Sequence, residues 1–134
     1  MNLLDKLKGG DLRSIGRSDE VVEVILETPQ LFGEVIEGIF SDDSIVRMRS
    51  ADAAEKASRR KHELLLPYKI CLFDASDISQ KEVQWHIAQM FSYLNLTSEE
   101  TKKVFDILIR YIETSNSNIV KVNSLQTLTN LALK

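Results

Sequence analysis

Histidine and cysteine, the side chains most used in metal sites and in nucleophilic catalysis, are scarce in this chain. The sequence contains two histidines, His62 and His86, and one cysteine, Cys71. A zinc site needs several ligands at short spacing, and neither histidine belongs to an HExxH motif. We therefore expect no metal site and no cofactor. A buried thiol is the favoured interpretation of Cys71, and a reactive nucleophile is the alternative.

Positive charge is concentrated in one stretch of an acidic chain. The whole chain carries 17 Lys and Arg against 20 Asp and Glu, a net charge of −3, which argues against a dedicated nucleic-acid binder. Residues 46–62 nevertheless form a basic patch. Arginine can bind carboxylates or phosphates through two parallel hydrogen bonds. The end of the patch predicts either a solvated helix end or an anion-binding site made of Arg59, Arg60 and Lys61.

A segment of similar outline occurs three times at a constant interval. The three stretches begin at Val46, Val83 and Val120, so the interval is 37 residues both times (83 − 46 and 120 − 83). The spacing of apolar residues within and between these stretches predicts two helices per interval, and no run alternates as a strand would. Helix hairpins of this kind bury their apolar faces only by stacking on one another.

Capping signals mark where several of these helices should begin. Thr97 and Glu100 have the spacing of a capping box, and so do Ser79 and Glu82. Ser18 is the expected N-cap of a helix that precedes the repeats.

The first repeated unit resembles a HEAT repeat. The stretch "PQLFGEVIEGIFSDDSIVRMRSADAAEKA" has a proline in the first helix, acidic residues in the turn, and Val-Arg followed by small residues at the fourth and seventh positions after the valine. The resemblance covers residues 18 to 133 and implies an all-α fold, a right-handed α-α superhelix. We expect a single domain with an N-terminal cap and three units: 1–27, 28–60, 61–96 and 97–134.

The register of the repeat predicts a polar wall on the second helices of the hairpins. Stacking brings equivalent positions together, and the positions away from the apolar face carry mostly polar side chains in each unit. Trp85 lies beside them as an apolar anchor, with partial burial against the neighbouring unit as the alternative. The predicted wall consists of Arg47, Met48, Arg49, Asp52, Lys56, Trp85, His86, Gln89, Asn123 and Gln126.

The resemblance implies functions of different classes, because most HEAT-repeat proteins bind other proteins while some relatives remove alkylated bases from DNA. The leading interpretation is a non-enzymatic scaffold or adaptor that binds a protein or peptide along the wall, anchored by Trp85 and Met48. The alternative is nucleic-acid binding or an alkylbase-DNA-glycosylase-like activity that uses Trp85, Asp52 and Arg49. A third hypothesis is homo-oligomerisation through the last helix, which lacks an obvious polar cap.

Composition predicts a globular cytoplasmic protein that does not enter membranes. Hydrophobic residues make up 43% of the chain and charged residues 28%, which is typical of a packed domain. The apolar runs are too short to span a bilayer, and the first ten residues lack the apolar core of a secretion signal. With one cysteine the chain cannot form an internal disulfide, which favours a reducing compartment.

Overall fold

The computed structural model describes residues 3, 7 and 18–134, and within this part every regular element is a helix, as the sequence predicted. Most of the predicted N-terminal cap, residues 1–27, lies outside the described residues. None of the described helices is both long and apolar enough to cross a lipid bilayer. The elements in chain order are α1 (Ser18–Glu27), η2 (Pro29–Leu31), α2 (Phe32–Gly38), α3 (Ser44–Arg60), η3 (His62–Tyr68), α4 (Lys69–Ala75), α5 (Lys81–Phe91), α6 (Ser98–Thr114) and α7 (Asn118–Ala132).

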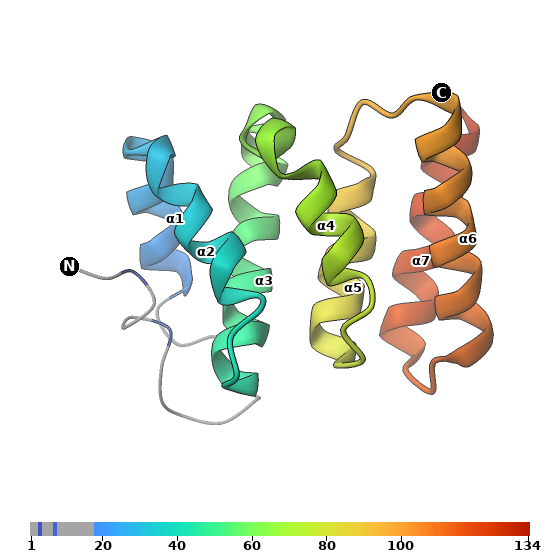
Figure 1. Ribbon diagram of the computed structural model, residues 1–134, viewed down its shortest axis with the longest axis horizontal. Coiled ribbons are helices and arrows are strands. Elements are labelled where there is room, and N and C mark those ends of the chain that lie inside the picture. The colour runs from blue at the N-terminus through green and yellow to red at the C-terminus, as the bar shows by residue number, and fades with distance from the viewer. Residues whose placement is uncertain (1–2, 4–6, 8–17) are drawn as a thin grey trace.

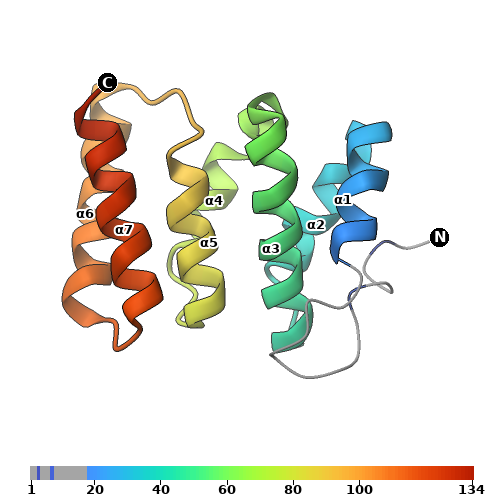
Figure 2. The same ribbon diagram turned by 180° about the vertical axis from the view of Figure 1, so that it is seen from behind.

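The helices are arranged in two layers. Figure 1 shows α2, α4 and α6 in front of α3, α5 and α7, and Figure 2 shows the same two layers from behind. In the rear layer α1 packs against α3, α3 against α5, and α5 against α7. In the front layer α2, α4 and α6 make no comparable contact with one another; each lies instead on the second helix of its own hairpin. The rear layer therefore provides the closest packing between successive hairpins, and side-chain contacts such as the ion pair of Lys69 with Glu100 at 3.1 Å join α4 to α6 in the front layer.

The core lies between the two layers and is continuous along the molecule. Four of the core residues of α3 are alanines, and their small side chains allow neighbouring helices to pack closely against it. Larger side chains fill the corresponding space on α5 and α6. The two described residues of the N-terminal segment, Leu3 and Leu7, are also buried in this core. The four alanines are Ala51, Ala53, Ala54 and Ala57, and the larger side chains include Ile87, Met90, Phe91, Leu108 and Tyr111.

Side chains cap the N-termini of three of the long helices. The Asp43 carboxylate accepts hydrogen bonds from the first backbone N–H groups of α3, and the Ser117 hydroxyl accepts one at the start of α7. The predicted capping box at α6 is confirmed, because Thr97 and Glu100 each accept a backbone N–H from the other. These bonds satisfy donors that have no partner within the helix.

Two other predicted caps are wrong. The N-cap of α5 is Gln80, which makes no side-chain cap, so Ser79 and Glu82 form no capping box. The Gln80 amide instead donates to the Ser44 carbonyl at 3.0 Å and links α5 to the preceding hairpin. Ser18 is the first residue of α1, and its hydroxyl donates to Asp52 Oδ2 on α3 at 2.8 Å. At both sites a tertiary contact replaces the local one.

Candidate functional site

Polar residues of the predicted wall are joined in pairs where one rear-layer helix meets the next. Asp52 Oδ1 on α3 lies 3.3 Å from His86 Nε2 on α5. Gln89 Nε2 on α5 donates to Asn123 Oδ1 on α7 at 3.2 Å. Both pairs are separated by 34 residues (86 − 52 and 123 − 89), three fewer than the repeat interval. Residues at equivalent positions of the repeat are therefore not the ones in contact. The position of His86 and Asn123 bonds the preceding rear-layer helix, and the position of Asp52 and Gln89 bonds the following one.

Arg49 occupies the position equivalent to His86 and Asn123, and it too bonds the element that precedes it. Its Nη1 donates to the Leu7 carbonyl at 2.9 Å, and the side chain is only 1% exposed. Met48 and His86 are buried as well. The prediction that these three residues lie on an accessible wall is wrong, because the N-terminal segment at Leu7 and the packing between helices cover them.

The remaining predicted residues, Arg47 among them, are half-buried or exposed. Arg47 is tied between hairpins, because its Nε donates to Gln80 Oε1 at 2.9 Å and its Nη1 to the Ser41 carbonyl at 2.8 Å. The other side chains are half-buried, and Gln126 is exposed. We refer to this accessible set as the second-helix wall: Asp52, Lys56, Trp85, Gln89, Asn123 and Gln126.

Asp52 supplies the carboxylate of the second-helix wall and contacts Ser18, Lys56 and His86. Burial by itself raises the pKa of this carboxyl, but hydrogen bonds with His86, Ser18 and Lys56 outweigh burial and lower the pKa from 3.8 to about 2. Lys56 Nζ lies 3.1 Å from Asp52 Oδ2 and 3.0 Å from Asp19 Oδ1 on α1. One ionised carboxylate thus connects α1, α3 and α5.

Trp85 and Asp52 share one nitrogen of His86. His86 Nδ1 lies 2.6 Å from the Glu82 carbonyl, which only accepts, so Nδ1 carries a proton. In a neutral ring Nε2 is then an acceptor and receives the Trp85 indole N–H at 3.2 Å. In a protonated ring Nε2 becomes a donor to Asp52, and the indole N–H loses this partner. The Trp85 indole and the Asp52 carboxylate therefore compete for one atom of His86.

A buried carboxylate, that of Glu55, links α3 to the turn that follows α5. Glu55 forms an ion pair with Arg59 on the next turn of α3, and the Tyr93 hydroxyl donates to Glu55 Oε2 at 2.7 Å. Burial, followed by the hydrogen bond to Glu55, raises the pKa of Tyr93 to about 12. Arg59 is thus a structural partner of Glu55.

The predicted anion-binding patch is largely neutralised. Besides the pair between Arg59 and Glu55, Arg60 Nη1 lies 2.9 Å from Glu23 Oε1 on α1. Lys61 is the C-cap of α3, and its backbone N–H donates to the Ala57 carbonyl. The groove beside these residues is lined by Lys56, Arg59 and Arg60 and by Asp19 and Glu23, and each of the three cations is paired with a carboxylate. A groove of this kind gives an anion no net attraction.

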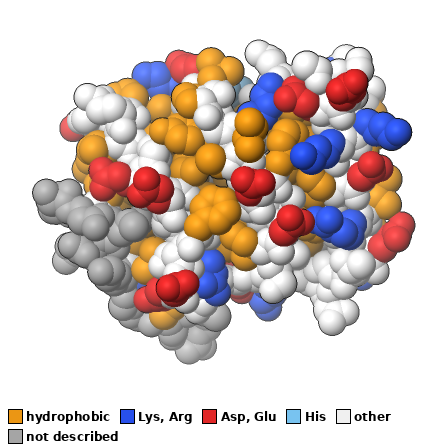
Figure 3. All heavy atoms as spheres, viewed as in Figure 1, with side chains coloured by type: hydrophobic (Ala, Val, Ile, Leu, Met, Phe, Trp, Pro, Cys, Tyr) orange, Lys and Arg blue, Asp and Glu red, His pale blue; other side chains and the backbone are white. Residues whose placement is uncertain are grey.

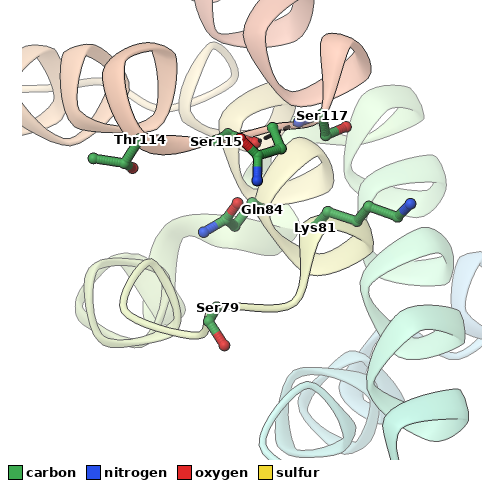
Figure 4. Close-up of a pocket in the computed structure, with 7 residues that line it drawn as sticks. Ser79, Lys81, Gln84, Thr114, Ser115 and Ser117 are labelled. Atoms are coloured by element: carbon green, nitrogen blue, oxygen red, sulfur yellow. Dashed lines mark hydrogen bonds between the residues drawn. The ribbon is translucent and has the colours of Figure 1, made fainter.

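A polar hollow lies between the turns that precede α5 and α7, as Figure 4 shows. Within it the Ser117 backbone N–H donates to the Ser115 hydroxyl at 3.0 Å. No carboxylate, histidine or cysteine lines it, so the hollow lacks a general base for hydroxyl activation. The lining residues are Ser79, Lys81, Gln84, Thr114, Ser115, Asn116 and Ser117.

The histidines and the cysteine do not form a reactive centre with one another. In the described part of the chain, no three His, Cys, Asp or Glu side chains come together as metal ligands. Cys71, on α4, is a half-buried free thiol that packs against the core. His62 stacks on the ring of Tyr93 with ring centroids 4.7 Å apart.

Comparisons with protein-family models, with curated proteins and with solved structures found no match to this chain. Sequence reasoning missed three residues that join the helices around the wall: Ser18, Glu55 and Gln80. One signal could have found Ser18. It precedes Asp52 by 34 residues, as Asp52 precedes His86 (52 − 18 and 86 − 52).

Proposed function

We propose that this chain is a non-enzymatic HEAT-like scaffold whose hairpins form a right-handed superhelix and that binds a peptide segment of another protein along the second-helix wall. The uneven packing of the two layers supports the superhelix. Rear-layer helices pack closely on one another, whereas α4 and α6 in the front layer meet mainly through side chains such as Lys69 and Glu100. A stack that is closer on one side curves toward that side. The wall then lies on the inner side of the curve, where a ligand meets several helices at once.

The observation that carries the proposal is that the wall is rigid before any ligand arrives. The Gln89 amide is fixed to Asn123, and the Asp52 carboxylate is fixed to Ser18 and Lys56. Side chains that are already ordered lose little conformational entropy on binding. The exposed Gln126 amide has a donor and an acceptor to offer to a peptide backbone, whereas Gln89 Oε1 is buried. A half-buried tryptophan beside them is typical of an interface anchor.

The contacts give less support to the nucleic-acid alternative. Affinity for nucleic acid depends chiefly on cations that meet phosphates, but Arg59 and Arg60 are paired with carboxylates and Arg49 is buried. Asp52, which would have to stabilise a sugar cation in base excision, is engaged by Ser18 and Lys56. The proposal therefore concerns protein recognition.

Selection of peptides from a displayed library, followed by titration, tests the proposal. Trp85 is the single tryptophan of the chain, so its intrinsic fluorescence reports binding at the wall. Trp85→Ala should weaken selected peptides by about tenfold or more in a labelled-peptide assay, as expected for loss of an anchor worth about 2 kcal/mol. Leu66→Ala, an exposed change on η3 in the front layer, is the matched control and should leave affinity unchanged.

Two results would count against this function. Peptides that bind Trp85→Ala as tightly as the wild type do not use the wall. Tight binding of a labelled DNA duplex at low salt, with a steep loss as salt is raised, would favour the nucleic-acid alternative instead.

A further inference from the structure

His86 is a titratable side chain enclosed where α5 meets α3. It is 7% exposed, and its Nδ1 lies 2.6 Å from the Glu82 carbonyl on the preceding turn of α5. Its other ring nitrogen, Nε2, has two neighbours: the indole nitrogen of Trp85 at 3.2 Å and Asp52 Oδ1 at 3.3 Å. The indole N–H needs an acceptor and the carboxylate needs a donor, so Nε2 satisfies one neighbour when it is bare and the other when it carries a proton.

The Asp52 carboxylate is prepared for the second of these bonds. Burial raises the pKa of its carboxyl, but hydrogen bonds with His86, Ser18 and Lys56 outweigh burial and lower the pKa to about 2. The carboxyl is therefore ionised over the whole range, from about pH 5 to 8, in which an ordinary histidine changes its charge. Ser18 Oγ at 2.8 Å and Lys56 Nζ at 3.1 Å both contact Oδ2, which leaves Oδ1 for His86. Lys56 also pairs with Asp19 on α1.

The other charges near this junction do not bond Nε2. On α5 itself, Glu82 is buried one turn before His86, and on α3 Arg49 donates to a backbone carbonyl of the N-terminal segment. α7 lies on the other side of α5 and faces it with Asn123, a neutral amide bonded to Gln89. α6 carries charges of both signs on the front of the molecule, away from the layer that contains His86 (Figure 3). Within the described part of the chain, no charged group of α4, α6 or α7 forms a hydrogen bond or an ion pair with His86.

Trp85 is the part of the second-helix wall that responds to a change at Nε2. Its side chain is half-buried and packs against the core, with its ring centroid 5.3 Å from that of His86. The packing of the ring against the core does not involve the N–H group. Loss of the bond to His86 therefore leaves the indole in place with an unused donor.

We propose that a proton taken up from solvent at His86 Nε2 moves the bond of this nitrogen from Trp85 to Asp52 and so opens the indole N–H to a ligand of the second-helix wall. The part that concerns a ligand rests on the proposed function. A peptide carbonyl that accepts the opened N–H does not have to displace His86. Peptide affinity should therefore rise as the pH falls from about 8 to about 5, by about threefold to tenfold for one hydrogen bond.

Nuclear magnetic resonance of the ¹⁵N-labelled protein, without any ligand, tests the exchange. The chain has a single tryptophan, so one indole N–H signal reports on Trp85. At about pH 8 the His86 Nε2 should have the chemical shift of an unprotonated nitrogen, because Nδ1 carries the proton of the neutral ring. As the pH falls to about 5, Nε2 should acquire a proton. The indole hydrogen should then exchange with solvent about threefold to tenfold faster, relative to free N-acetyltryptophanamide at the same pH, because it has lost a hydrogen bond.

His62→Gln is the matched control, because His62 is the other histidine of the chain and stacks on Tyr93. This variant should keep the change in the indole signal, whereas His86→Gln should abolish it. Asp52→Asn should move the change to lower pH, because the imidazolium loses its carboxylate partner. Wall-binding peptides that lack histidine and carboxylates, titrated at about pH 8 and about pH 5, measure the effect on affinity.

The proposal is overturned if the neutral His86 ring carries its proton on Nε2, if the indole signal does not change as His86 becomes protonated, or if Asp52→Asn leaves the change at the same pH. It is overturned as well if the exchange occurs but peptide affinity is the same at both pH values. Failure of the proposed function would look different, since no peptide would then bind at either pH while the nitrogen signals would still report the exchange.

Discussion

Replacing Asp52 with asparagine is the sharpest test of the bonds between rear-layer helices. The substitution keeps the shape of the side chain but removes the charge that faces Lys56 and His86 and that accepts from Ser18. If the carboxylate connects α1, α3 and α5, the free energy of unfolding should fall even though Asp52 belongs to no hydrophobic contact.

The expected size follows from the pKa of the carboxyl. A fall from 3.8 to about 2 corresponds to about 2.4 kcal/mol, at about 1.36 kcal/mol for each pH unit. Asp52 is only partly buried, so solvent screening reduces this contribution. We expect Asp52→Asn to lower the free energy of unfolding by about 1 to 2 kcal/mol at neutral pH.

The dependence on pH has a definite sign. The pKa is lower in the folded protein than in the unfolded chain, so the contribution is complete above pH 3.8 and is lost as the pH falls through about 2. Urea unfolding measures this contribution. The free energy of unfolding of the wild type and the variant is compared at neutral pH and again at a pH between 3.8 and about 2. The difference in stability should be largest at neutral pH and should shrink toward pH 2.

Asp106→Asn is the matched control, because Asp106 is an exposed aspartate within α6. Its stability should stay within about 0.5 kcal/mol of the wild type, as is usual for surface substitutions. The reasoning about the junction is refuted if Asp52→Asn is as stable as the wild type at neutral pH, or if the gap between them is the same at every pH.

Two further substitutions test buried polar groups. The Ser124 hydroxyl is buried and has no hydrogen-bond partner among the described residues, so Ser124→Ala should stabilise the protein by about 1 kcal/mol, since alanine also favours a helix; lower stability in urea unfolding would contradict this. Arg49→Ala should destabilise by about 2 to 4 kcal/mol, because it leaves a cavity and an unpaired Leu7 carbonyl. The exposed change Arg60→Ala should cost less than about 1 kcal/mol, and an equal loss in the two variants would show that Arg49 is not a buried partner.

Local signals in the sequence predicted much of the secondary structure. The helical class follows from the spacing of apolar residues, and the capping box of Thr97 and Glu100 follows from chemistry contained within four residues. Ser79 and Glu82 have the same spacing but form no capping box, because Gln80 between them is hydrogen-bonded to Arg47 and Ser44 of the preceding hairpin. A local pattern cannot reveal a competing partner that is distant in the chain.

The exposure of the site could not be predicted for the same reason. Helical periodicity correctly separates Asp52 and Gln89 from the apolar core, but it does not show which polar side chains meet the next helix. Arg49 is buried, and it donates a hydrogen bond to the Leu7 carbonyl, 42 residues earlier in the chain. Asn123 is equivalent to Arg49 in the repeat and remains half-buried. Equivalent positions of the repeat thus differ in exposure, because the segment that covers each one lies outside its own helix hairpin.

The contrast between the two layers also determines how the molecule can bend. Moving α4 and α6 apart separates side-chain pairs such as Lys69 with Glu100, whereas sliding α3 along α5, or α5 along α7, disrupts the closest packing between helices together with the bonds of Asp52 with His86 and of Gln89 with Asn123. Deformation should therefore resemble the opening of a fan, with the pivot in the rear layer. A ligand that presses on the wall would change the spread of the front helices and leave the order of the pivot intact.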